Sequence, residues 1–469
     1  MRGIKMAYSI PPGILEILDR TQSGTVCSEK EWNTKVVPRG IMEKLKEHSL
    51  TKTCDPNNPI NMDDSLADEF YKAGFEYAVE TGMLCTDTQR VIKFSEEELK
   101  EALKAAPKEI TLGEGLDRFT MKARRPEDKT VPIFAATLGI AISEELWIPL
   151  MIGVAQNREI DMLEGPALET VYGRPLKSGT PYETLAGNLQ AKMHQEVIRR
   201  AGRPGIPAGA VITSPTEYGQ FGGYGVVGGY KPTDVAIVLF PSELKTNYTC
   251  LQKVVHAINV GGLIRTCSWA MVGGYSGPPE GNVVSAIAFF LLERPVHQAV
   301  YGGCGVYDFR YFGNCGREAL WANSIVFQGV GRNTHLLTES IINQTAGPCT
   351  DQLLYESSVG LMDVSVSSSS MSIGPRSAAG KYTNHISPLE AKFCAEVFKA
   401  CAGMKRSDAN EIAKAIIPKY EDKLLNPPKG KAFNECYDLK TIKPTKEWQE
   451  IYNRVKREII DLGIPVEFP

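Results

Sequence analysis

Between residues 131 and 385, short apolar runs alternate with longer amphipathic stretches, and glycine-rich joints separate them. The runs are of strand length, and the stretches repeat their apolar positions with the period of a helix. Strands are predicted at residues 131–137, 206–213, 235–240, 262–269, 298–302 and 336–342. Helices are predicted between them at residues 182–201, 248–259, 282–293 and 317–327. Repeated strand–helix units are typical of a parallel α/β barrel or a doubly wound sheet.

The number of strand–helix units is close to eight, which favours the barrel. The first unit also lacks the glycine fingerprint with which dinucleotide-binding sheets begin. The glycine-rich run at 219–229 (GQFGGYGVVGG) has neither that spacing nor the Lys-Ser/Thr ending of a phosphate loop. We therefore interpret it as a flexible loop over the barrel mouth. The run at 365–372 (SVSSSSMS) alternates in the manner of a small-residue strand, and we predict a strand there.

The flanking segments are predicted to be helical. Ser95 begins a helix with a capping-box pattern, and the acidic run 63–69 begins another, because negative side chains are favoured at a helix N-terminus. Helical patterns return at residues 386–402, 408–420 and 447–462. We therefore expect an α/β protein with a (β/α)8 barrel. Its expected parts are an N-terminal helical segment (1–130), the barrel (131–385) and C-terminal helices (386–469) that complete and flank it.

Composition and charge exclude several functional classes. The chain has 43% hydrophobic residues, 23% charged residues and a formal net charge of −3, and no basic patch stands out. No apolar run reaches the roughly 18–20 residues that a membrane helix needs. The first residues also lack the apolar core of a signal peptide. We therefore expect no nucleic-acid partner, no membrane contact and a cytoplasmic location.

The eleven cysteines are scattered and include no CxxC pair, and the six histidines show no HxxxH or HExxH spacing. In a cytosolic protein we expect such cysteines to be reduced and mostly buried. Local motifs therefore predict no metal site. A zinc site assembled from distant strands stays open, with Cys267, Cys304, Cys315 and Cys349 as its candidates.

Five motifs follow one another along the chain. They are GMLCTDTQRVIKF at 82–94, AGRPG at 201–205, GGYSG at 273–277, AGPCT at 346–350 and AFNECYDLKTIKPT at 432–445. Together they resemble the monomethylamine:corrinoid methyltransferase family over nearly the whole chain. The resemblance implies a (β/α)8 barrel, a homo-oligomer with a hexamer as the expected form, and methyl transfer to Co(I). The corrinoid (cobalamin) is then supplied by a cognate corrinoid protein, and no tightly bound cofactor of the chain's own is expected.

The functional residues of that family do not carry over. In the family a pyrrolysine follows AGRPG after three residues, and Gly209 occupies that position here. A glutamate six residues before GGY lands on Cys267, and a glutamine and a tyrosine before AGPC land on Ile341 and Asn343. The chain therefore resembles a divergent member without the side chain that activates monomethylamine. A different small methylated substrate is expected.

Methyl transfer to Co(I) is a displacement at carbon, in which the protein orients the methyl group and lets the amine depart. A quaternary ammonium leaves as a neutral amine, so it needs neither an imine adduct nor a proton donor. The missing pyrrolysine side chain is also expected to leave room in the barrel for a bulkier substrate. A quaternary ammonium or a similarly activated donor is therefore the first hypothesis.

Aromatic faces bind such cations. Trp269 and Tyr301 lie near the predicted C-terminal ends of strands, where barrel active sites form. The predicted substrate-binding residues are Tyr224, Trp269, Tyr301, Tyr307, Asp308 and Arg310. Glu339 is a carboxylate on a barrel strand, so it either faces a ligand or is paired. The predicted catalytic positions are Gly209, Cys267, Glu339 and Asn343.

Purely structural interpretations of these residues stay open. The aromatic side chains could be packing, Asp308 and Arg310 could pair in a solvated loop, and Cys267 could be buried filler. Two other functions also stay open. One is a zinc-dependent methyltransferase for a thiol or alcohol, with strand cysteines as ligands. The other is a non-catalytic homologue that binds a corrinoid protein.

Overall fold

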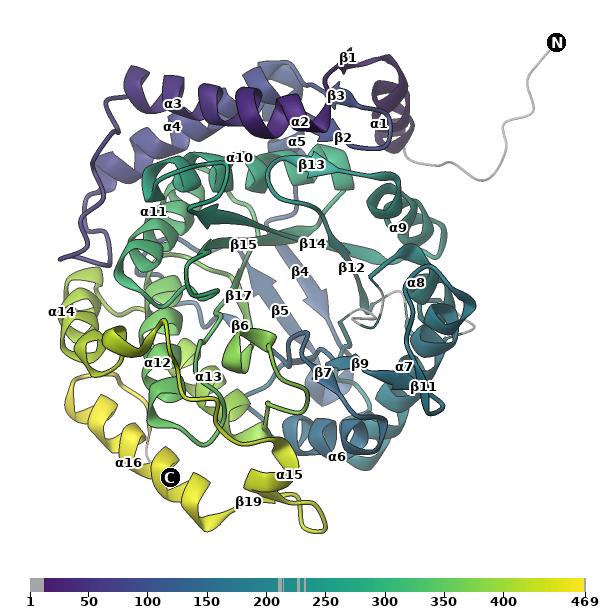
Figure 1. The fold of residues 1–469 in the computed structure, drawn as a ribbon, viewed down its shortest axis with the longest axis vertical. Helices are drawn as coiled ribbons and strands as arrows, with labels where there is room; N and C mark the ends of the chain where they lie inside the picture. The colour runs from purple at the N-terminus through teal and green to yellow at the C-terminus, as the bar shows by residue number, and fades with distance from the viewer. Residues whose placement is uncertain (1–11, 210–212, 214, 226–227, 232, 468–469) are drawn as a thin grey trace.

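A ring of parallel strands forms the centre of the molecule (Figure 1). The computed structural model describes residues 12–209, 213, 215–225, 228–231 and 233–467. In order around the ring, the main sheet contains β12 (Val235–Leu239), β14 (Leu263–Val272), β15 (Tyr301–Asp308), β16 (Thr338–Ile341), β17 (Met371–Ile373), β6 (Ile133–Ala136) and β8 (Met162–Leu163). Parallel bridges from Leu163 to Ala208 and from Gly209 to Val235 close the ring. The predicted (β/α)8 barrel is thereby confirmed.

Helices surround the ring on its outer side (Figure 1). They are α6 (Glu144–Ala155), α7 (Pro181–Arg200), α8 (Glu217–Gly223), α9 (Tyr248–Asn259), α10 (Pro279–His297), α11 (Arg317–Asn333), α12 (Asp351–Val366) and α13 (Pro388–Ala400). Helix α10 is buried from Glu280 to His297, because it packs on β14 and β15 on one side and on α4 on the other. It is therefore buried on all faces rather than along one stripe, and its few charged side chains, such as Glu293 and Arg294, are buried with it.

The N-terminal segment forms a second layer over one side of the barrel, shown in purple in Figure 1. Its helical parts are α1 (Pro12–Ser23), α2 (Glu29–Glu31), a π-helical turn (Trp32–Val36), α3 (Val37–Glu47), α4 (Asp64–Thr81) and α5 (Glu96–Ala105). The predicted capping box at Ser95 is confirmed, and the Asp63 carboxylate caps α4. The segment is not helical throughout. Strands β1 (Thr25–Val26), β3 (Arg90–Ile92) and β2 (Met83–Cys85) form a small sheet with β13 (Lys245–Thr246).

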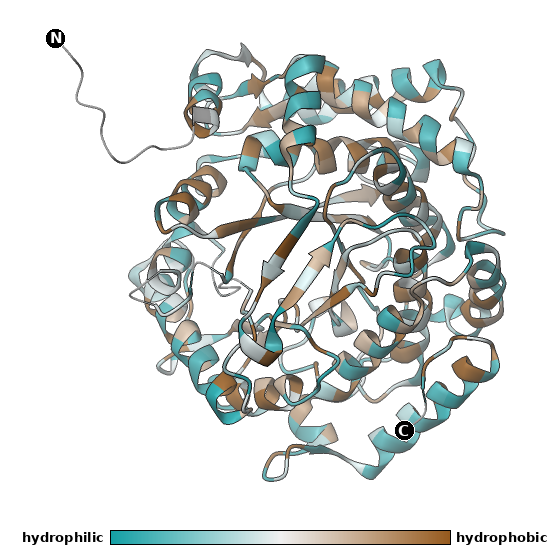
Figure 2. Cartoon of the chain, turned by 180° about the vertical axis from the view of Figure 1, so that it is seen from behind, coloured by the Kyte–Doolittle hydropathy of each residue, from teal (hydrophilic) through white to brown (hydrophobic). Residues whose placement is uncertain are grey.

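A hairpin closes the N-terminal end of the barrel. β4 (Glu109–Leu112) pairs with β5 (Phe119–Lys122), and the two strands lie across the ring when the molecule is seen from behind (Figure 2). Leu112 and Met121 of the hairpin belong to one buried apolar cluster with residues of the barrel interior. The mouth of the barrel is therefore at the C-terminal ends of the strands, where active sites of this fold form.

The C-terminal helices α14 (Arg406–Ile416), α15 (Phe433–Cys436) and α16 (Lys446–Asp461) pack on the outside of the barrel (Figure 1). Helix α16 buries Trp448, Tyr452, Val455 and Ile459, which share one helical face. Short strand pairs join the loops: β7 (Ala141–Ile142) with β9 (Ala167–Leu168), β10 (Thr170–Val171) with β11 (Arg174–Pro175), and β18 (Tyr437–Asp438) with β19 (Lys443–Pro444). Across the residues that the structure describes, no helix combines the length and the apolar character needed to cross a membrane.

Four predicted segments differ from the structure. The strand predicted at 206–213 is present only as single bridges at Ala208 and Gly209, and residues 210–212 lie outside the described residues. The strand predicted at 298–302 begins only at Tyr301 and continues to Asp308, because α10 extends to His297 and Gln298 ends it with a φ of 55°. The strand predicted at 365–372 is wrong over most of its length: α12 continues to Val366, a turn follows, and β17 begins at Met371. The predicted loop at 219–229 begins as helix α8, and residues 226–227 lie outside the described residues.

Candidate functional site

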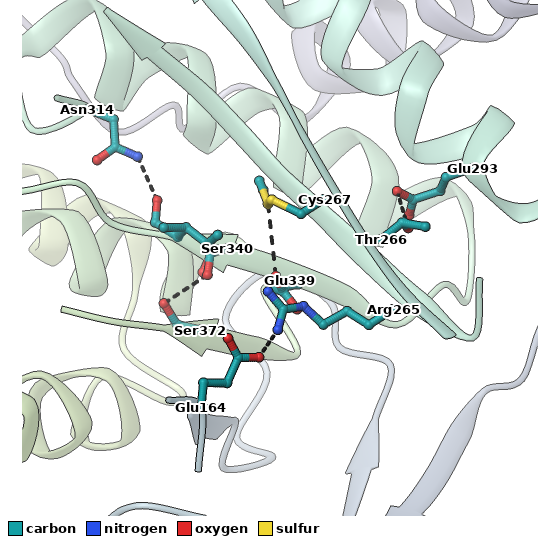
Figure 3. Close-up of a disulfide and its surroundings, with 11 residues drawn as sticks. Glu164, Arg265, Thr266, Cys267, Glu293, Asn314, Glu339, Ser340 and Ser372 are labelled. Carbon is teal, nitrogen blue, oxygen red and sulfur yellow. Dashed lines mark hydrogen bonds and ion pairs between the residues drawn. A yellow bond between two sulfur atoms is a disulfide. The ribbon is translucent and has the colours of Figure 1, made fainter. Parts of the chain in front are cut away.

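Polar side chains line the inner face of β14. Arg265, Cys267 and Trp269 alternate along this strand and therefore share one face. Cys267 and Trp269 belong to the cluster that fills the barrel interior. Thr266, on the opposite face, donates a hydrogen bond of 2.8 Å to Glu293 of α10 (Figure 3). The strand thus places an arginine, a cysteine and a tryptophan in order from the closed end of the barrel toward its mouth.

Arg265 lies between two carboxylates (Figure 3). Its Nε is 2.7 Å from Glu339 Oε2 on β16, and its Nη1 pairs with Glu164, which directly follows β8. All three side chains are fully buried. Burial raises the pKa of Glu339 to about 7, and the positive charge of Arg265 opposes this rise. With both carboxylates ionised, the cluster carries one excess negative charge, which suits a cationic ligand.

Gly209 opens onto this charged cluster. Its N–H donates to the carbonyl of Leu163 at 2.7 Å, so its backbone belongs to the barrel wall. A Cβ at this position would lie 2.6 Å from both Cγ and Oε1 of Glu164. Position 209 therefore faces the barrel interior, as the resemblance implies. The space next to it is filled by the Glu164 side chain, which corrects the expectation that the missing side chain leaves this spot free.

Cys267 and Cys304 are joined as a disulfide in this structure, with 5.5 Å between their Cα atoms. This differs from the expectation that the cysteines are all reduced. The pair forms because β14 and β15 are parallel neighbours, with Cys267 opposite Gly303 and Ser268 opposite Cys304. The other described cysteines are free and, apart from Cys54, buried, as predicted. Cys315 and Cys349 do not join the pair, so a zinc site made of all four candidates is wrong.

The backbone of β15 is unusual where it carries Cys304. Gly303, Cys304 and Gly305 have φ values of 134°, 113° and 108°. A left-handed φ is costly for cysteine, because its Cβ crowds the backbone. The reversal breaks the alternation of the strand. Cys304 therefore faces inward toward Cys267, although its partner in register, Ser268, lies on the outer face of β14.

Two aromatic side chains lie on the mouth side of the cysteine pair. Trp269 and Tyr307 meet edge to face, with ring centroids 5.4 Å apart and planes at 82°. Burial raises the pKa of Tyr307, and the charge of Arg376, which follows β17, opposes the rise. The structure thus brings together two of the predicted substrate-binding residues where a cation entering the mouth would meet them.

The remaining predicted residues lie elsewhere or act differently. Tyr301 is buried inside the barrel but is the first residue of β15, so it lies toward the closed end rather than the mouth. Tyr224 donates its hydroxyl to the carbonyl of Asp234, just before β12, and so lies at the closed end outside the interior cluster. A buried tyrosine needs such a hydrogen-bond partner, and this bond holds Tyr224 away from the mouth.

Asp308, Arg310 and Asn343 are engaged in bonds within the chain. Arg310 pairs with Asp308 and also with Glu318, so the predicted pairing is confirmed. Asp308 is, however, the buried last residue of β15 and not part of a solvated loop. The N–H of Asn343 donates to Asn314 Oδ1 at 2.8 Å, in the loop that follows β15. The structure does not bring these three residues to the charged cluster.

Glu164 and Arg265 are the residues of the candidate site that sequence reasoning missed. Glu164 follows a strand of two residues, which is too short to show a pattern. Arg265 gives a usable signal, because an arginine within the largely apolar strand LIRTCSWAMV must be paired when buried. Alternation along that strand also places it on the face of Cys267.

Comparison with known proteins gives one consistent result. The family model described as Monomethylamine methyltransferase MtmB matches residues 13–464. Monomethylamine methyltransferase MtmB of Methanosarcina mazei is 30% identical over 450 residues, which cover 96% of this chain and 97% of the relative. Monomethylamine methyltransferase MtmB1 of Methanosarcina acetivorans is 29% identical over the same shares.

Solved structures agree with the sequence relatives. The crystal structure of the Methanosarcina barkeri monomethylamine methyltransferase (MtmB) superposes with a TM-score of 0.92 at 28% identity. The alignment covers 97% of this chain and 98% of that chain. A crystal structure described as the hydroxylamine MtmB complex has the same TM-score, identity and coverage. The likeness therefore extends over the barrel and both flanking segments.

Proposed function

Because the chain belongs to the monomethylamine methyltransferase MtmB family, we propose that it transfers a methyl group from a donor other than monomethylamine to Co(I) of a corrinoid protein. The observation that carries the proposal is the glycine at position 209. This position faces the barrel interior, and glycine offers no side chain to activate a primary amine. Glu164 fills the adjacent space and pairs with Arg265. We therefore propose that this chain acts on its donor without an activating side chain at position 209, and that other side chains of the barrel bind and orient the donor.

A quaternary ammonium compound is the first donor class. The buried cluster of Glu164, Glu339 and Arg265 has more negative than positive charge when both carboxylates are ionised. On its mouth side, Trp269 and Tyr307 offer aromatic faces to a cation. A quaternary ammonium also departs as a neutral amine, so the site does not have to deliver a proton.

The chain's own part in the reaction is binding and orientation. Trp269 and Tyr307 would hold the methylated cation at the mouth, with one methyl group pointing outward. The corrinoid, carried by its own protein, supplies Co(I) as the nucleophile. The hairpin β4–β5 closes the far end of the barrel and so limits the entry of water from that side. In-line attack from the mouth then displaces the amine into the barrel.

A panel of methyl donors tests the proposal. The protein is incubated with Co(I) cobalamin and, separately, with monomethylamine, tetramethylammonium, a betaine, a methylated thiol and methanol. Formation of methylcobalamin is followed by its absorbance. We expect product with a quaternary ammonium compound and none with monomethylamine. Reaction with monomethylamine alone would overturn the proposal. Binding of a corrinoid protein without reaction of any donor would instead identify a non-catalytic homologue.

A thiol or alcohol is the second donor class, and one observation favours it. Cys267, Cys304 and Glu339 lie together inside the barrel. A metal ion held there would bind the sulfur or oxygen of the donor and stabilise it as a leaving group. In the same panel, this alternative predicts that a methylated thiol or methanol reacts, and that added zinc restores the reaction of chelator-treated protein.

A further inference from the structure

Three metal-ligating side chains meet on neighbouring strands inside the barrel: Cys267 on β14, Cys304 on β15 and Glu339 on β16. Their ligand atoms all lie within 4.8 Å of one another, and all three residues are buried. The Sγ of Cys304 is 3.9 Å from Glu339 Oε1. We infer that these three side chains, with both cysteines reduced, bind one divalent metal ion of the zinc type.

The donor set suits such an ion. Zinc binds cysteine thiolates and carboxylate oxygens, usually with four ligands in a tetrahedron. Three protein ligands leave a fourth position for a small molecule, which is the arrangement of catalytic rather than structural zinc sites. Trp269 and Tyr307 lie on the mouth side of the three ligands, so a molecule in the fourth position would be within the barrel.

Arg265 orients the carboxylate of Glu339. Its Nε contacts Oε2 at 2.7 Å, while Oε1 is the oxygen that lies near Cys304. One oxygen is thus held by the guanidinium and the other faces the two sulfurs. Groups that orient a metal ligand in this way are part of most metal sites, and their removal weakens binding.

The charges of the cluster also favour a divalent ion. Two thiolates and Glu339 carry three negative charges, which a divalent ion and Arg265 match. Glu164, paired with the same guanidinium, adds one negative charge when ionised. Without a metal ion, the two thiols could not both ionise to thiolates in this buried site, because isolated buried charges are strongly disfavoured.

The backbone of β15 provides independent support. Gly303, Cys304 and Gly305 all have left-handed φ values, and this reversal turns Cys304 inward. A side chain at Gly303 would overlap the ring of Phe290 on α10. Strained backbone of this kind persists where the surrounding structure enforces it, and it is frequent at ligand sites. Here it places the second sulfur beside the first sulfur and Glu339.

The disulfide and the metal site are alternative states of the same two cysteines. In the disulfide neither sulfur is a thiolate, so neither can act as a ligand in the proposed way. A dithiol or phosphine reductant supplies two electrons, and with two protons the disulfide becomes two thiols. Binding of the metal ion then releases the two thiol protons as both sulfurs become ligands. Metal binding is therefore expected only in the reduced protein.

This inference goes beyond the proposed donor, because metal binding is measured without any donor or corrinoid. The full chain is reduced with a phosphine in the absence of oxygen, and Co²⁺ is titrated as a spectroscopic probe, followed by zinc. We expect one metal ion per chain and a near-ultraviolet band from thiolate-to-cobalt charge transfer. The wild-type protein left oxidised is the control and should bind no ion.

Variants assign the ligands. Cys267→Ser and Cys304→Ser should abolish the charge-transfer band, and Glu339→Gln should weaken metal binding. Arg265→Gln should lower the affinity by about 10–100-fold while the band is retained. Cys349→Ser is the matched control, since that buried cysteine lies outside the three-residue cluster. Absence of binding by the reduced wild type would overturn the inference, as would equal binding by the oxidised protein or by the double variant Cys267→Ser/Cys304→Ser.

Discussion

At its closed end the barrel is filled by apolar side chains such as Leu112, Met121 and Val235, whereas midway along the same barrel Arg265 is enclosed by Glu164 and Glu339. Both regions are buried. The hairpin β4–β5 helps to fill the closed end, whereas Arg265 and Glu339 lie on strands of the main sheet. The closed end shows that apolar packing is sufficient to fill this barrel. Buried ion pairs are often no more stabilising than apolar residues of similar volume. The difference between the two regions therefore indicates that the charged one is suited to a ligand.

The largest effect on the free energy of unfolding is expected from variants that remove charges from the cluster and keep its volume similar. Arg265→Met leaves two carboxylates buried without their partner, and we expect a loss of roughly 3–5 kcal/mol in the free energy of unfolding. The triple variant Glu164→Leu/Arg265→Met/Glu339→Leu converts the region to the character of the closed end. It should recover most of that loss, as measured by urea denaturation. Equal stability of Arg265→Met and the wild type would show that the cluster is not a coupled unit.

A smaller effect is expected from the strained backbone of β15. Gly303→Ala introduces a Cβ that overlaps Phe290, whereas a Cβ added at Gly115, which has a φ of 55°, would meet no atom within 4 Å. Gly115→Ala is thus a control with a left-handed φ but open space. We expect Gly303→Ala to be less stable than the control by about 1–3 kcal/mol, because of overpacking. Equal thermal denaturation of the two variants would mean that β15 relaxes freely at this position.

Glu356, in the outer layer of helices, is a buried carboxylate without an ion pair and can be compared with the charged cluster through the pH dependence of stability. Glu356 of α12 is fully buried and accepts hydrogen bonds from Thr345 and Gln352 rather than an ion pair. Burial raises its pKa to about 7, and these hydrogen bonds oppose the rise. The folded state therefore holds this proton more tightly than the unfolded state, whose carboxyl has a pKa near 4.5.

The contribution of Glu356 to stability is then complete below about pH 4.5 and is lost as the pH rises through about 7. We expect Glu356→Gln to flatten the fall in unfolding free energy between those values, measured by denaturation at a series of pH values. An unchanged slope in the variant would assign the pH dependence to other groups.

The smallest expected effect concerns the donor. Trp269→Leu should raise the KM for a quaternary ammonium donor by about 2–30-fold, since a cation–aromatic contact contributes roughly 0.5–2 kcal/mol. Tyr224→Phe is the matched control, because Tyr224 lies at the closed end and away from the mouth. Steady-state kinetics with Co(I) cobalamin measure both values. An equal KM in both variants would remove Trp269 from the donor site.

The barrel could be predicted from the sequence because its strands are buried on both faces and therefore form apolar runs between amphipathic helices. The pattern of apolar positions does not define the ends of helices and strands where the local sequence fits more than one structure. Gln298 ends α10 through a left-handed turn that no apolar pattern shows, so the pattern predicts β15 too early. The serines after α12 are buried, and they make hydrogen bonds such as that from the Ser368 hydroxyl to the carbonyl of Phe327, so their alternation does not mark a strand.

The candidate site could be predicted only in part. Gly209, Cys267 and Glu339 are accessible to sequence reasoning, because motifs fix the first two positions and a charged residue on a strand marks the third. Their partners Glu164, Arg265 and Cys304 are brought to them by the barrel. Which side chains meet across it depends on register and on the backbone reversal at Cys304, and neither is visible in the order of residues along one strand. The predicted place of Tyr224 is wrong for another reason: it follows α8, and its hydroxyl donates to the carbonyl of Asp234 at the closed end.

The central claim is that the donor is not monomethylamine, and a direct competition tests it. The protein and Co(I) cobalamin are given monomethylamine and tetramethylammonium in equal amounts, each with a distinct isotopic label in its methyl group. The label in methylcobalamin is then read by mass spectrometry. The account predicts that none of the transferred methyl groups comes from monomethylamine. Methylcobalamin labelled mainly from monomethylamine would contradict it, because Gly209 has no side chain with which to activate that substrate.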